Sequence, residues 1–304
     1  MKPSKNVVWL SWLIVALALV AAVIGLFYQD GGSAFSFTTL RGQIVQIYGQ
    51  GLYRYDGPIT AVGFRAADAV TLVLAIPLLV ASIVLYRRGR LQGGLLLVGM
   101  LAYFLYNYGS MAVGAVYNSL FLVYVALFSA SLFGLVLSLT SFDLQGLPAH
   151  FSKDLPRRGM GLFLVVSGVI LALVWLVLSI VPALLQGAAP PEVASSTTFI
   201  TGVMDEGIVA PTLILSGALL LRRAPIGYLL ASMLLVFTVT LGTNLLAAGI
   251  AQLLTGVISI GQFIGMTVPF AILTLIATWL TVILFRRFSE SAAPLAAKAR
   301  VAHA

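Results

Sequence analysis

The stretch Phe64–Arg90, FRAADAVTLVLAIPLLVASIVLYRRGR, decides how this chain folds. It carries Arg65 and Asp68 near its start, then runs without a charge to Tyr86 and ends in the basic turn 87–90. The apolar part matches the roughly 20 residues that a helix needs to cross about 30 Å of hydrocarbon. The segment therefore predicts a membrane-spanning helix with a basic connector at one end.

The whole chain has the same character as this stretch. Of its 304 residues, 61% are hydrophobic and only 9% are charged, whereas soluble domains carry roughly 25% charged residues. A soluble fold could not hide so much apolar surface. In lipid every backbone N–H and C=O must be paired internally, which leaves helices or a closed barrel. The apolar runs are long and do not alternate, which favours helices.

Eight apolar spans of crossing length predict an all-α, polytopic membrane protein. The sixth is short and could begin at Ile200. The first has an apolar run of about 22 residues, longer than the roughly 7–15 of a signal peptide. The spans cover Val7–Tyr28, Phe64–Tyr86, Leu91–Tyr108, Ser119–Thr140, Gly161–Leu185, Glu206–Leu221, Ile226–Ala248 and Thr267–Phe285.

The basic residues are sorted by side. With the N-terminus in the cytoplasm, all of the 17 lysines and arginines except Arg41, Arg54 and Arg65 fall in cytoplasmic segments. Because lysine and arginine asymmetry sets orientation, this predicts a cytoplasmic-membrane protein with both termini in the cytoplasm. The net charge of +8 then reflects orientation and does not indicate nucleic-acid binding.

An internal repeat is predicted from two aligned segments. Gly94–Gly109 and Gly227–Gly242 share seven of sixteen residues without gaps. Upstream, each half has an acid, a mid-span proline and a double arginine. These features predict two parallel four-helix repeats. The alternative is that any two leucine-rich spans joined by arginines look alike.

The predicted organisation has four parts. Residues 1–145 form the first repeat and 146–160 a cytoplasmic linker. The second repeat covers 161–288 and a cytoplasmic tail 289–304. The outer loop 29–63 is rich in aromatic residues, which predicts a packed cap. The glycine-rich stretch 248–265 is interpreted as an interfacial or re-entrant segment.

Polar side chains collect in the outer halves of the spans. Arg65 and Asp68 are three residues apart, so they can pair on one helix face. If the polar stripes face inward, they converge on an outward-facing pocket for a small molecule. The alternative is that the tyrosines are interfacial anchors and the acids structural pairs. The candidate ligand-binding residues are Arg65, Asp68, Tyr103, Tyr106, Asn107, Tyr117, Asn118, Asp205 and Asn244.

The sequence offers little catalytic chemistry. It has no cysteine, and its two histidines, His150 and His303, lie in predicted cytoplasmic segments. No metal site or cofactor is predicted. The hypotheses are a small-molecule transporter or ligand-binding protein, an outer-leaflet enzyme using Asp68 or Asp205 as acid or base, and a structural partner without a site.

Three short motifs carry a resemblance to a family. Gly51–Asp56, Tyr103–Tyr108 and Tyr117–Tyr124 resemble a family of prokaryotic multi-pass membrane proteins. The resemblance covers the first half of the chain best. It implies a membrane location, and it implies neither an activity nor a catalytic residue.

Overall fold

The structure, a computed structural model, describes residues 3–190 and 193–290. Within this part of the chain, eight helical spans are long and apolar enough to cross a membrane, so the all-α polytopic fold is confirmed. His303 and most of the predicted tail lie outside the described residues. The spans cover Lys5–Phe27, Pro58–Arg87, Leu91–Gly114, Phe121–Leu139, Arg157–Leu185, Ile200–Leu221, Pro225–Leu254 and Ile260–Arg286.

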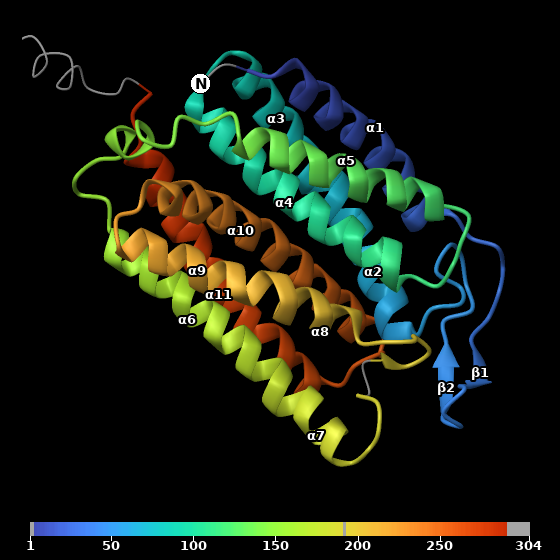
Figure 1. Cartoon of the computed structure of the whole chain (residues 1–304). Coiled ribbons are helices and arrows are strands. Elements are labelled where there is room, and N and C mark those ends of the chain that lie inside the picture. The colour runs from blue at the N-terminus through green and yellow to red at the C-terminus, as the bar shows by residue number, and fades with distance from the viewer. Residues whose placement is uncertain (1–2, 191–192, 291–304) are drawn as a thin grey trace, which may run out of the picture.

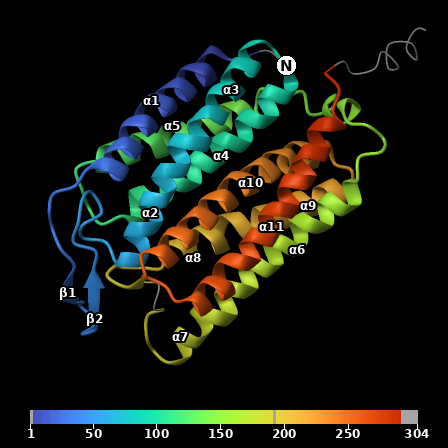
Figure 2. The ribbon, with the colours of Figure 1, turned by 180° about the vertical axis from the view of Figure 1, so that it is seen from behind.

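The helices form two groups in chain order (Figures 1 and 2). The first contains α1 (Lys5–Phe27), α2 (Pro58–Val70), α3 (Ile76–Arg87), α4 (Leu91–Gly114) and α5 (Phe121–Leu139). The second contains α6 (Arg157–Trp175), α7 (Val181–Leu185), α8 (Ile200–Met204), α9 (Ala210–Leu221), α10 (Pro225–Leu254) and α11 (Ile260–Arg286). Helices α4 and α10 pack against each other at the centre, and α10 also contacts α2.

Both described chain ends lie at one end of the bundle, here called the basic end (Figure 1). The linker residue Ser152 donates its N–H to Arg287 O at 2.8 Å. The Glu290 carboxylate accepts the N–H groups of Leu91 and Gln92 at 2.9 and 3.1 Å. The linker also contains the short helix η2 (Leu147–His150). The N-terminus, the linker 146–160 and the residues after α11 are separated by four spans each, and an even number of spans returns the chain to the same end of the bundle.

The opposite end, here called the hairpin end, carries two short strands that the sequence reading missed. Strands β1 (Phe35–Thr38) and β2 (Ile44–Ile47) pair antiparallel. Residues 48–57 fold back beside them, and Tyr48 N–H bonds to Asp56 O at 2.9 Å. The predicted loop also ends early, because Pro58 starts α2 with a ring that suits the first helical position.

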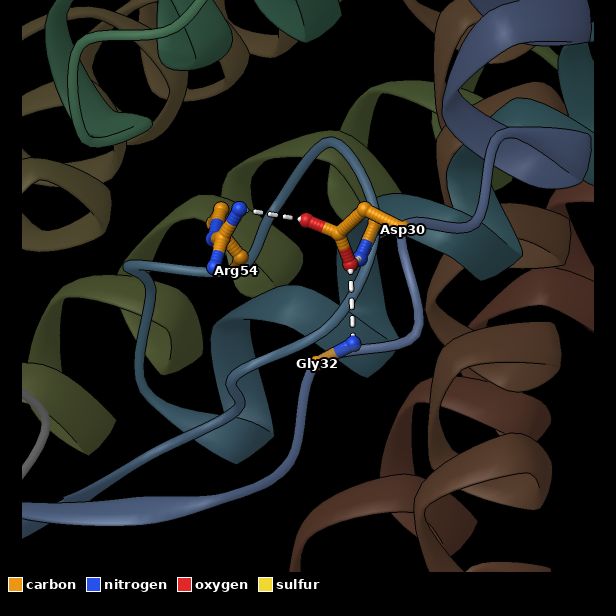
Figure 3. A network of polar contacts seen from close by, with 4 residues as sticks. Asp30, Gly32 and Arg54 are labelled. Atoms are coloured by element: carbon orange, nitrogen blue, oxygen red, sulfur yellow. Dashed lines mark hydrogen bonds and ion pairs between the residues drawn. The ribbon is translucent and has the colours of Figure 1, made fainter.

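A network of polar contacts around Asp30 holds residues 48–57 to the end of α1. Asp30 forms an ion pair with Arg54 at 2.6 Å and accepts the N–H groups of Gly51 and Gly32 at 2.9 and 3.3 Å (Figure 3). The Gly51 N–H lowers the pKa of Asp30 most. The predicted packed cap therefore exists between residues 48 and 57, while β1 is exposed along its whole length.

The stretch 248–265 is not a separate re-entrant segment, which corrects that part of the prediction. It is the end of α10, a turn, and the start of α11. Gly256 turns the chain at φ 72°. Ser259 then starts α11 with a capping box, in which Ser259 and Gln262 bond each other's backbone N–H. Local capping chemistry thus joins two full spans.

Three spans contain a π-helical turn just before a proline. These turns are η1 (Thr71–Ala75), η3 (Leu176–Ile180) and η5 (Asp205–Val209). Pro77, Pro182 and Pro211 each follow two residues after the turn. Proline lacks an N–H, and its ring clashes with the preceding turn. A widened turn accommodates this in a membrane helix.

The two halves share landmarks that are 134 residues apart. They are Pro77 and Pro211, the left-handed residues Gly89 and Arg223, and Gly93 and Gly227, which pack on the preceding helix. In this pairing Gly227 corresponds to Gly93 and not to Gly94. The two acids Asp68 and Asp205 are not equivalent in it. The repeat itself stays a prediction.

We expect the substitution Arg223→Gly to stabilise the protein by about 0.5–1 kcal/mol, because Arg223 is held at φ 62°, where a Cβ is strained. The neighbouring Arg222 has a helical φ of −75°, so Arg222→Gly should instead destabilise by a similar amount. Unfolding in mixed detergent micelles measures both. Equal effects of the two substitutions would contradict the argument.

Candidate functional site

The predicted site residues do not share one pocket. Six of the nine lie in three pairs around α4, in which neighbouring residues of α4 meet different partners. Tyr106 bonds to Asp205, and Asn107 pairs with Asn244. Tyr103 faces the region of Asp68. Successive helical residues are about 100° apart, so one short stretch of α4 serves three interfaces.

Asp68 lies fully buried, with 0% of its surface exposed, near the end of α2 and well inside the second span. Its Oδ2 accepts a hydrogen bond of 2.7 Å from the Tyr53 hydroxyl, which also accepts one of 3.3 Å from Tyr124. The other oxygen, Oδ1, has no hydrogen-bond partner among the described residues. The buried side chains of Tyr103 and Tyr108 lie close enough to interact electrostatically with Asp68, and Thr71 lies beside both tyrosines.

The predicted Arg65–Asp68 ion pair is wrong. The Arg65 guanidinium donates to the Tyr48 hydroxyl at 2.7 Å and to Leu26 O at 3.2 Å. It therefore bonds the folded segment and the end of α1, while the Asp68 side chain turns inward toward α1. Arg65 and Asp68 share a helix face but do not pair, because each side chain bonds to a residue of another element.

Gly25 of α1 makes room for the Asp68 carboxylate. A Cβ at Gly25 would collide with Asp68 Oδ2 and lie 2.8 Å from the Tyr53 hydroxyl oxygen. A small cavity of about 10 Å³ opens beside these residues, lined by Gly25, Tyr53, Tyr48, Arg65 and others of the segment 28–52. This volume holds about one water molecule.

Tyr53 stays protonated in this setting. Burial, followed by the nearby charge of Asp68, raises its pKa well above the usual range. Its hydroxyl therefore remains a hydrogen-bond donor to the carboxylate at all physiological pH values. The sequence singled out Tyr53 only as a loop aromatic, since the contact spans 15 residues and a change of element.

Asp205 has both oxygens satisfied. Oδ1 accepts from the Tyr106 hydroxyl and Oδ2 from Trp175 Nε1, each at 2.8 Å. The Trp175 ring packs edge-on against Phe199, with centroids 5.0 Å apart. This carboxylate thus joins α4, α6 and the start of the sixth span. It acts as a structural clamp and has no free acceptor.

The remaining predicted residues are in polar contacts or at the surface. Asn107 Oδ1 accepts from Asn244 Nδ2 at 3.4 Å, across the α4–α10 interface. Asn118 Oδ1 accepts Leu120 N–H at 2.9 Å in the turn that precedes α5. Tyr117 is 77% exposed beside Phe121, as an interfacial anchor would be.

An open groove of about 390 Å³ lies at the hairpin end, between α7, the loop after it and α8. Its walls are mostly apolar and include Phe199 and Val203. Among the described residues Glu206 is the acid that lines it, and Glu206 Oε1 is shielded from solvent and has no hydrogen-bond partner in that part of the chain. Arg41 also lines the groove, but its guanidinium donates to Ser196 O and Thr197 O at 3.4 and 2.9 Å.

The sequence reading did not include these groove residues in the site. Glu206 entered that reading only as the first residue of the sixth predicted span, although its position beside Asp205 was a signal. The π turn η5 carries both acids and directs Asp205 inward and Glu206 to the groove. Among the described residues no group of three or more histidine and acidic side chains could hold a metal ion.

Comparisons with protein-family models, with curated proteins and with solved structures found no match for this chain. The resemblance to a family of prokaryotic multi-pass membrane proteins therefore stays a prediction.

Proposed function

We propose that this chain is a small-molecule transporter of the cytoplasmic membrane that binds its ligand at the hairpin end. In this proposal the basic end faces the cytoplasm, because it holds the double-arginine turns after α3 and α9. The hairpin end then faces outward, and the groove meets solutes arriving from outside.

The observation that carries the proposal is the groove with its free acceptor at Glu206. Its volume of about 390 Å³ falls within the usual size of small-molecule sites, and such sites pair apolar walls with a few polar groups. The ion pairs of the described residues are Asp30–Arg54 and Asp154–Arg287, so neither involves Glu206. A cationic donor from a ligand would satisfy its carboxylate.

These features favour an amphipathic amine as the ligand. Its ammonium would donate to Glu206, and its apolar part would lie against the walls, where the Phe199 ring can also attract a cation. Arg41 does not neutralise Glu206, because backbone carbonyls already bind its guanidinium.

The test compares 2-phenylethylammonium with the neutral 2-phenylethanol on the purified protein. We expect the ammonium to bind and to change the fluorescence of Trp175, which packs on Phe199. Glu206→Gln should weaken this binding by about 10- to 100-fold, the loss expected for a hydrogen bond to a charged group. The exposed acid Asp143 supplies the control Asp143→Asn, which should bind as the wild type does.

Equal binding of the alcohol and the ammonium, or unchanged binding by Glu206→Gln, would overturn the ligand assignment. Uptake of the bound amine into proteoliposomes then separates transport from binding alone. The enzyme hypothesis finds less support, because Asp68 and Asp205 are buried and line neither outer cavity.

A further inference from the structure

The Asp68 carboxylate forms no ion pair with any described side chain, although Arg65 lies close enough to act on it electrostatically. It is completely buried. The nearest cation on its helix, Arg65, bonds to Tyr48 and Leu26 instead. An ionised carboxylate in an apolar interior costs several kcal/mol unless it is paired. Either a proton or a bound cation must therefore neutralise it.

The surroundings suit a proton better than a metal cation. The titratable groups that face Asp68 are Arg65 on its own helix, Tyr53 of the folded segment, Tyr103 and Tyr108 of α4, and Tyr124 of α5. A metal cation would need several oxygen ligands, and among the described residues no group of three or more histidine and acidic side chains could hold one. A carboxyl proton requires only one acceptor, and hydroxyl oxygens lie close by.

A route for the proton leads from the hairpin end. Tyr53 and Gly25 touch the carboxylate and also line the water-sized cavity. A hydronium ion in this cavity can give a proton to the Tyr53 oxygen while Tyr53 passes its own proton to Oδ2. Water, an intact tyrosine and a neutral carboxylic acid result, so charge and atoms balance.

We propose that Asp68 is a reversible proton-binding site that is loaded from the hairpin end through the Tyr53 hydroxyl. Buried acids within membrane spans commonly serve as proton relays. The site would give the transporter proposed above its coupling ion. Its test needs no substrate, so it can succeed where the amine proposal fails.

Infrared spectroscopy of the reconstituted protein tests the binding of the proton. We expect a carbonyl band of a buried carboxylic acid that weakens as the pH rises and shifts on labelling with [4-¹³C]aspartate. Asp68→Asn should remove this band, and the exposed-acid control Asp143→Asn should keep it. The isotope shift reports on the unaltered protein even if Asp68→Asn does not fold.

Two results would overturn the proton assignment. One is a spectrum without a pH-dependent aspartic-acid band. The other is loss of the band when sodium or potassium is added at constant pH, which would indicate a metal-cation site.

The route is tested by the rate of proton exchange after a pH jump outside the proteoliposomes. Tyr53→Phe removes the transferring hydroxyl and keeps the ring, so we expect exchange to slow by about tenfold or more. Tyr117→Phe removes an exposed hydroxyl at the same end and should leave the rate unchanged. Equal rates for both variants would overturn the route through Tyr53.

Discussion

In the variant Asp56→Asn we expect the unfolding free energy to lose a pH dependence that the wild-type protein has. Between pH 4 and pH 8 the Asp56 carboxyl lowers the unfolding free energy of the wild type by about 4 kcal/mol, and the variant should lack this decrease. Asp56 is only 2% exposed, and its Oδ2 has no hydrogen-bond partner among the described residues. Its Oδ1 accepts Val116 N–H at 2.9 Å. Burial raises the pKa of Asp56 from 3.8 to about 7, against the lowering effect of that hydrogen bond.

The sign follows from proton binding. Between pH 4 and pH 7 the folded protein keeps the Asp56 proton, whereas the unfolded chain has released it. The folded state therefore loses stability as the pH rises, by about 1.4 kcal/mol per unit, and the loss levels off above about pH 7. Asp56 joins the folded segment to the α4–α5 connection, so this contact should weaken at alkaline pH.

Unfolding in mixed micelles at several pH values measures this slope. Asp143→Asn should retain the wild-type slope, because Asp143 is exposed. The lowered pKa of Asp30 acts in a different range, since its stabilising effect is full above about pH 4 and is lost as the pH falls further. An unchanged slope in Asp56→Asn would contradict the assignment to Asp56.

Asp205→Ala is expected to destabilise the protein by about 3 kcal/mol. The substitution leaves the Tyr106 hydroxyl and Trp175 N–H without their acceptor in an environment with little water. Each donor then bears its desolvation cost unpaired. The clamp between α4 and α6 is lost as well, and with it the support of Phe199 in the groove wall.

Ser216→Ala provides the matched control. Ser216 lies on the same span and is also buried, and its hydroxyl has no hydrogen-bond partner among the described residues. Its removal should change the unfolding free energy by less than about 0.5 kcal/mol. Asp205→Asn keeps one acceptor oxygen, so its loss of unfolding free energy should lie between those of Asp205→Ala and Ser216→Ala. If Asp205→Ala changed the unfolding free energy as little as Ser216→Ala, the hydrogen bonds of Asp205 would not stabilise the protein.

Much of the fold could be predicted from local composition. Every predicted span overlaps an observed one, because a crossing requires only a long apolar run. The boundaries were less predictable. Pro58 and the Ser259 capping box start helices earlier than hydropathy suggests. The hairpin was missed because its short strands lie in a loop whose aromatic residues predicted only packing.

The sequence identified the buried acids, but it did not predict which side chains they bond to. Asp68 and Asp205 stood out as acids at membrane depth, yet they have opposite roles. Asp205 accepts hydrogen bonds from two donors, while Asp68 accepts one and its Oδ1 has no partner in the part of the chain that the structure describes. Their partners Tyr53 and Trp175 come from other elements, and spacing along one helix cannot reveal them.

The sequence by itself determined that this chain crosses a membrane and how its apolar and basic segments alternate, because hydrophobic length and charge act through the local chain alone. Only the tertiary structure decided that Arg65 bonds to Tyr48 instead of Asp68 and that Glu206 faces a groove. The physical reason is that a polar side chain in lipid bonds to whichever donor or acceptor packing brings within about 3 Å. That neighbour is set by helix packing across distant parts of the chain.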